Sequence, residues 1–291
     1  MKPADVGLAV LVAVVWGLGF VASRLVLDEL PPMLMTALRF TIAATPCLVL
    51  HRPKVSWGLL IAISFTLFIG QFVSQSYGIK LGVPVGLASV IVQSQALFTI
   101  AFAAITFREV PSGMQLAGIA VAAIGLLMIC GTVGYDFSAG AFAIMMISPV
   151  CFAMGNILLR QAHGVPMFDL FAWLSFTAAL PLLLLTVLTD GVAPIWQSLT
   201  HVSLQAILCM LALGGITTSF AYWLWGRLLR DNPAAQVVPF ALLVPFVGAG
   251  ASAIVFHEKF GPLRLAGMLT VIGGIAVMLL AKRLQAVLKI A

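Results

Sequence analysis

Two stretches of the chain repeat each other: residues 103–125 read AAITFREVPSGMQLAGIAVAAIG, and residues 252–274 read SAIVFHEKFGPLRLAGMLTVIGG. In each stretch an apolar run ends in an aromatic residue and a glutamate, and a Leu-Ala-Gly element lies in the apolar run that follows. Matched positions are 149 residues apart, as for Glu109 with Glu258 and Gly118 with Gly267. Self-similarity at a fixed offset indicates an internal duplication.

The composition restricts the class of protein. Only 8% of the 291 residues are charged and 62% are apolar, whereas soluble domains are about 25% charged. So little polar surface excludes a soluble enzyme, a nucleic-acid-binding protein and a disordered chain. We attribute the net charge of +6 to basic loops at an anionic membrane surface. The chain is therefore predicted to be a polytopic membrane protein.

The apolar residues form long continuous runs. A transmembrane helix needs about 20 such residues, and a membrane β-barrel would instead show segments of about ten residues with alternating polarity. We predict an all-α integral membrane protein with short loops, the longest at 190–201. Its ten transmembrane helices are expected at residues 6–27, 34–50, 57–79, 84–107, 113–131, 139–159, 166–188, 202–226, 234–256 and 262–281.

The duplication assigns five helices to each half. Because five is odd, the second half must enter the membrane from the opposite side, which predicts an inverted-topology repeat of 1–136 and 137–291 within one transmembrane domain. Ten Lys and Arg residues then lie on the side of the N-terminus and four on the other, so both termini are expected in the cytoplasm. This architecture favours a transporter with alternating access, although duplication also builds channels.

The paired motifs, together with Pro245 in the ninth span and a Tyr-x-x-Lys element at Tyr77–Lys80, resemble the EamA-type permeases. These are the ten-helix branch of the drug/metabolite transporter superfamily, and the resemblance covers essentially the whole chain. It implies a bacterial inner-membrane exporter, most similar to exporters of amino acids, including aromatic ones. One position departs from the family pattern: Ala96 stands where the proline matching Pro245 is usual. We therefore expect the fourth span to be straighter than the ninth.

Neutral polar side chains within the spans are candidates for a substrate cavity. Unpaired in lipid, each would cost several kcal/mol, so each should face water, substrate or another helix. Gln95 lies about 200° from Gln93 on a regular helix, so only one of them should line the cavity, and we favour Gln93. A glutamine can equally bond a neighbouring helix, and Trp or Tyr can be an interfacial anchor. The predicted cavity residues are Trp16, Phe20, Gln71, Gln75, Gln93, Asn156, Thr218, Tyr222 and Trp225.

Charged residues are expected near the span ends. All nine acids lie there, so we predict uniport without a deep carboxylate proton relay; the alternative is a proton-coupled exporter of drugs or organic cations. Glu109 and Glu258 are family-signature residues that we expect to compensate helix N-termini. Arg39 lies within the second span, where we expect it to snorkel outward or to pair with Asp28 or Glu29, with a substrate role as the alternative.

No other chemistry is indicated by the sequence. We find no catalytic constellation and no metal or cofactor motif, so neither an enzyme nor a cofactor is expected. The expected partners are a small-molecule substrate and the lipid bilayer, without nucleic acid. Ten helices suffice to enclose a cavity without a partner subunit.

Overall fold

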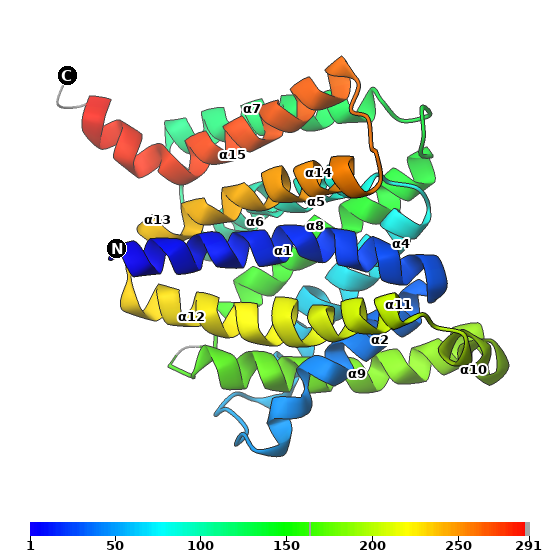
Figure 1. The fold of residues 1–291 in the computed structure, drawn as a ribbon. Coiled ribbons are helices and arrows are strands. Elements are labelled where there is room, and N and C mark those ends of the chain that lie inside the picture. The colour runs from blue at the N-terminus through cyan, green and yellow to red at the C-terminus, as the bar shows by residue number, and fades with distance from the viewer. Residues whose placement is uncertain (163, 289–291) are drawn as a thin grey trace.

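The computed structural model describes residues 1–162 and 164–288, of which residues 234, 235 and 281–288 are described by their backbone alone. Within this part of the chain every regular element is helical (Figure 1). The first half holds α1 (Pro3–Glu29), α2 (Pro32–Ala43), α3 (Trp57–Ile63), α4 (Gln71–Lys80), α5 (Val85–Gln93), α6 (Gln95–Phe107) and α7 (Gly113–Cys130). The second half holds α8 (Ala139–Leu159), α9 (Met167–Asp190), α10 (Val192–Thr200), α11 (Leu204–Leu211), α12 (Ala221–Asp231), α13 (Ala234–Val237), α14 (Leu243–Val255) and α15 (Pro262–Leu288).

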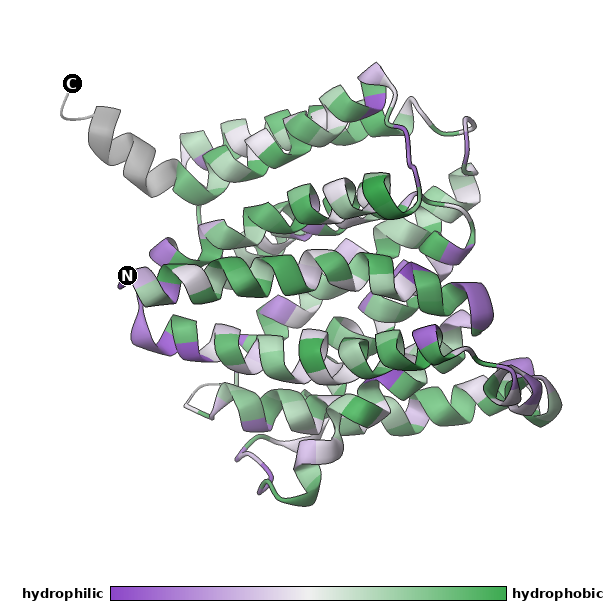
Figure 2. Cartoon of the chain, viewed as in Figure 1, coloured by the Kyte–Doolittle hydropathy of each residue, from purple (hydrophilic) through white to green (hydrophobic). Residues whose placement is uncertain are grey.

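Several spans combine shorter helices. The π-helix η2 (Ser64–Gly70) joins α3 to α4, and the π-helix η3 (Ala212–Phe220) joins α11 to α12. The 3₁₀ segment η4 (Val238–Leu242) joins α13 to α14. With these joins, nine helices in the described residues are long and apolar enough to cross a membrane, and α2 is a shorter apolar helix. Hydrophobic residues dominate their length and hydrophilic ones gather mainly toward their ends (Figure 2). The prediction of an all-helical membrane protein is confirmed.

Two predicted boundaries are wrong. The second span was expected over 34–50, but α2 ends at Ala43 and a 3₁₀ turn follows at Thr45–Leu48, because Pro46 has no N–H with which to continue an α-helix. The expected loop at 190–201 contains the helix α10. Gly191, with φ of 79°, separates α10 from α9. Apolar residues at 192, 195, 196 and 199 then give α10 the 3.6-residue period that the loop prediction overlooked.

The two halves run in opposite directions. α1 starts where the Met1 ammonium contacts the Gln236 side chain, 2.7 Å away, and ends where the Glu29 carboxylate accepts a hydrogen bond from the Ser203 backbone N–H. We call these two places the N-terminal end and the far end of the bundle. α8 starts at the far end and runs back, because five crossings precede it. The start of α1 and the end of α15 lie toward the same end in Figure 1.

Glycines fix a layer made of α7 and α15 at one side of the molecule (Figure 1). A Cβ on Gly118 would lie 2.7 Å from the Gly274 carbonyl oxygen, and a Cβ on Gly125 would lie 2.8 Å from that of Gly267. Backbones therefore touch at two points related by the repeat, as in small-residue packing of membrane helices.

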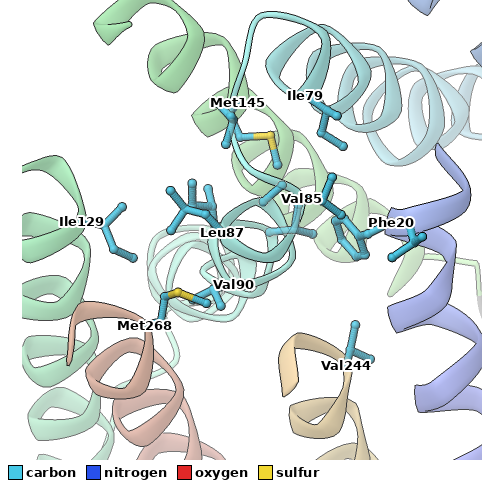
Figure 3. Close-up of a cluster of buried hydrophobic side chains, with 14 of the residues drawn as sticks. Phe20, Ile79, Val85, Leu87, Val90, Ile129, Met145, Val244 and Met268 are labelled. Atoms are coloured by element: carbon cyan, nitrogen blue, oxygen red, sulfur yellow. The ribbon is translucent and has the colours of Figure 1, made fainter. Parts of the chain in front are cut away.

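The main core surrounds α5. Leu87 and Val90 of this helix are fully buried, and side chains from α1, α8, α14 and α15 close around them, among them Met145 and Met268 (Figure 3). The helix that carries Gln93 is thus held rigidly from several sides, which positions one wall of the site described next.

Candidate substrate cavity

A cavity of about 360 Å³ lies between the two halves. This volume is in the usual range for small-molecule pockets, about 300–1,000 Å³. Eight of the nine residues expected from the sequence line it, namely Trp16, Phe20, Gln71, Gln75, Gln93, Asn156, Tyr222 and Trp225. Their role in substrate binding stays a prediction.

Thr218 does not line the cavity, contrary to expectation, and its neighbour Thr217 does. The reason is the π-helix η3, in which the Thr218 hydroxyl donates to the Leu213 carbonyl five residues earlier, at 2.8 Å. A π-turn holds more residues than an α-turn, so faces assigned with the α-helical period are displaced beyond it. The corresponding span of the first half carries a π-helix too, η2, just before Gln71.

Gln95 lines the cavity together with Gln93, so the prediction that only one of them does is wrong. The regular helix is interrupted between them: α5 ends at Gln93, and α6 begins at Gln95 after Ser94. The Ser94 hydroxyl donates to the Ile91 carbonyl at 2.6 Å and so satisfies that oxygen at the break. Both the fourth and the ninth spans are interrupted near the cavity, at Ser94 and at the 3₁₀ segment η4, and the expectation of a straighter fourth span stays a prediction.

Gln93 also joins the halves. Pro245 has no N–H to donate to the Ala241 carbonyl four residues earlier, and the Gln93 side-chain Nε2 donates to that oxygen at 2.6 Å. Gln95 makes a second link between the halves, because its Oε1 accepts from Asn156 Nδ2 at 3.0 Å. The side-chain amides of Gln93, Gln95 and Asn156 are therefore fixed by hydrogen bonds.

Aromatic rings form another part of the lining. The ring of Trp16 lies 5.4 Å from that of Tyr222 and 5.1 Å from that of Trp225, and Tyr222 stacks on Phe171 at 4.5 Å. The Trp16 indole N–H donates to the Thr217 carbonyl at 3.1 Å. Trp16, Tyr222 and Trp225 all line the cavity, as expected.

Arg39 lies in the cavity wall, where the sequence analysis placed it only as the alternative to snorkelling or pairing with an acid. It neither snorkels nor pairs with Asp28 or Glu29: Asp28 pairs with Arg24 at 3.1 Å, and Glu29 accepts hydrogen bonds from Ser203. Arg39 is only 6% exposed. The signal that could have found it is its position in the apolar run, because an intramembrane cation marks a functional site by default.

The cavity extends toward one end of the bundle only. Its lining reaches Leu159, the last residue of α8, Met167, the first residue of α9, and Leu229 near the end of α12, all at the N-terminal end. At the far end the Glu29 carboxylate holds both the backbone N–H and the hydroxyl of Ser203. The structure is therefore closed at the far end.

The two signature glutamates lie outside the cavity. The carboxylate of Glu258 accepts from the backbone N–H groups of Val85, at 2.6 Å, and Gly86, at 3.0 Å. It thus caps the N-terminus of α5, a helix of the other half. Glu109 pairs with Arg160 at 2.7 Å, also across the halves.

Comparisons with known proteins agree with this architecture. The model of a family described as "EamA-like transporter family" matches the chain twice, over residues 5–131 and 139–280. A protein of Salmonella typhimurium named "Probable amino-acid metabolite efflux pump" is 36% identical over 282 residues, which are 94% of each chain. A protein of the same name from Escherichia coli is 32% identical over 297 residues, covering 100% of this chain and 99% of that one. A solved crystal structure shares the fold with a TM-score of 0.68 and 18% identity, over 98% of this chain and 99% of the other.

Proposed function

Since the chain belongs to the EamA-like transporter family, we propose that it exports amino acids, including aromatic ones, or related small metabolites by alternating access. The observation that carries the proposal is the cavity between the two halves, whose lining combines side-chain amides with aromatic rings. Similarity to two proteins named amino-acid metabolite efflux pumps supports the substrate class. The N-terminal end is taken as the cytoplasmic side of a bacterial inner membrane, so the cavity faces the side from which an exporter collects its substrate.

The lining supports uniport. Among the described residues that line the cavity none is an acid, and the acids Glu109 and Glu258 take part in an ion pair and in a helix cap. Without a carboxylate beside the substrate, a proton relay through the cavity has no carrier.

A second candidate function is the export of organic cations, and the aromatic wall favours it because such rings bind cations. The same wall suits the apolar part of an aromatic amino acid. A cation in this cavity would also face the guanidinium of Arg39, which weakens the second candidate relative to the first.

Counterflow in proteoliposomes tests the proposal. The purified protein is reconstituted and loaded with unlabelled phenylalanine, and uptake of labelled phenylalanine and of other amino acids is followed with and without a pH gradient. We expect saturable flux that ignores the gradient. A Gln75→Leu variant should raise KM, whereas Thr66→Val, on the same span but outside the lining, should not.

Two results would contradict the proposal. If no amino acid is transported and cells that express the protein become resistant to cationic dyes, the cation-exporter function is favoured. Strong acceleration by the pH gradient would refute uniport and make Glu109 and Glu258 the first residues to replace.

A further inference from the structure

The described part of the chain has two buried arginines, and only one of them has an ion-pair partner. Arg264 is 4% exposed and makes a bidentate ion pair with Asp136, at 2.6 and 2.8 Å. Arg39 is 6% exposed, yet none of the ion pairs of the described residues includes it. An arginine keeps its charge in proteins, and a buried charge is costly unless it is paired.

The contacts of Arg39 are all with neutral side chains. Its Nε donates to the Thr218 hydroxyl at 2.9 Å, and its Nη2 donates to the Thr217 hydroxyl at 3.3 Å. Its guanidinium carbon lies 4.2 Å from the centre of the Phe72 ring. These contacts fix the orientation of the guanidinium plane but bring no negative charge.

Part of the guanidinium remains available to a ligand. Within the described residues Nη1 has no hydrogen-bond partner, and it is not among the atoms sealed from solvent. A guanidinium has five N–H donors, and two are used. The remaining donors have the planar fork geometry that matches a carboxylate.

A second polar group of the cavity lacks a partner. Gln71 is 4% exposed and lines the cavity, and its Oε1 is sealed from solvent without a hydrogen-bond donor among the described atoms. It directly precedes Phe72, the ring beneath the guanidinium of Arg39. An unpaired amide oxygen is an acceptor for an ammonium group, and a rotation of the Gln71 amide would bring this oxygen to the cavity. The cavity then offers complementary groups for both ends of a zwitterion.

From these contacts we propose that Arg39 binds the carboxylate of the substrate and that Gln71 accepts a hydrogen bond from its amine. The substrate class is then molecules with a free carboxylate beside an apolar or aromatic group, in which the amine adds affinity but is not required. The inference rests on the proposed export function only for the identity of the cavity as the substrate site. Binding can be measured without transport.

The experiment uses the purified full-length protein and its intrinsic tryptophan fluorescence, because Trp16 and Trp225 line the cavity. Four probes are titrated: phenylalanine, phenylalaninamide, 3-phenylpropionate and 2-phenylethylamine. The two carboxylates should bind about tenfold or more tighter than the two compounds without one, the ratio typical of one charge-assisted hydrogen bond. Equal binding of phenylalanine and phenylalaninamide to the wild type would overturn the proposal without any variant.

Variants then assign the preference to a residue. Arg39→Gln should reduce the ratio to within about twofold, whereas Arg39→Lys, which keeps the charge without the fork, should retain part of it. Arg230→Gln removes the same charge from an exposed site at the end of α12 and should leave the ratio unchanged. If Arg39→Gln kept the full carboxylate preference, the role of Arg39 would be refuted.

Parallel counterflow separates this inference from the export proposal. If carboxylates bind in a way that depends on Arg39 but no amino acid is transported, the export proposal is refuted and the anion site stands. If phenylalanine and phenylalaninamide are transported at equal rates, the export proposal stands and the anion site is refuted.

Discussion

Replacing Gly274 by alanine should destabilise the protein, whereas the same change at the adjacent Gly273 should not. A Cβ at position 274 would lie 2.6 Å from the Gly118 carbonyl oxygen and closer still to the Ala122 backbone nitrogen. Both are main-chain atoms of a packed helix, so neither can turn away. A Cβ at position 273 meets nothing within 4 Å.

The magnitude follows from two opposed terms. Overpacking a well-packed contact costs about 1–3 kcal/mol, and alanine gains about 1 kcal/mol over glycine within a helix. Gly274→Ala should therefore lose up to about 2 kcal/mol, and Gly273→Ala should gain up to about 1 kcal/mol. At about 2 °C per kcal/mol for a chain of this size, their melting temperatures should differ by about 2–6 °C.

The assay is thermal unfolding of both variants in one detergent at one scan rate, since membrane proteins unfold irreversibly and the apparent midpoint depends on the rate. Binding of phenylalanine should be the same in both, because no described residue of α7 or α15 lines the cavity. Equal melting temperatures would show that α7 and α15 are not in backbone contact in the membrane protein. Weaker binding in Gly274→Ala alone would show that this layer also sets the shape of the cavity.

Three further changes have defined outcomes. In a fluorescence titration, Gln71→Leu should weaken binding of phenylalanine about fivefold or more. Binding of 3-phenylpropionate should be unchanged, since that probe has no amine. Equal losses of affinity for both probes would contradict the role of Gln71. Gln93→Leu leaves the Ala241 carbonyl without its side-chain donor and should cost about 1–3 kcal/mol, seen as a lower melting temperature; an unchanged midpoint would contradict it. The third change introduces Glu29→Cys and Ser203→Cys in a background without the four native cysteines and joins the two new cysteines with a short bis-maleimide. The cross-link should hold the far end closed, so counterflow should be abolished and substrate binding preserved. Undiminished flux would refute closure at that end.

The number and kind of helices could be predicted because the bilayer imposes them. A chain with 8% charged residues must satisfy its backbone in lipid within helices or a closed barrel, and the long apolar runs indicate helices. The errors fall where this constraint is weakest. Pro46 shortens α2, and Gly191 starts the separate helix α10 near a bundle end, where loop and helix have similar composition.

Cavity residues could be predicted where the helix is regular. Gln71 and Gln75 lie one turn apart on α4, and both face the cavity. The same reasoning failed at Thr218 and at Gln95, where a π-helix and a helix break displace the faces. Neither irregularity follows from local sequence, since each is stabilised by bonds to other parts of the fold.

Arg39 shows the remaining limit of sequence reasoning. Its partners Thr217 and Thr218 lie 178 and 179 residues away, so no local pattern could place them beside it. Gln93 with Ala241 and Trp16 with the Thr217 carbonyl likewise join the first half to the second at the cavity wall. Any motion that separates the halves must break these bonds or carry them along. A carboxylate held by Arg39 would neutralise the one charge at this boundary among the described lining residues, and so would lower the cost of bringing the halves together around the substrate.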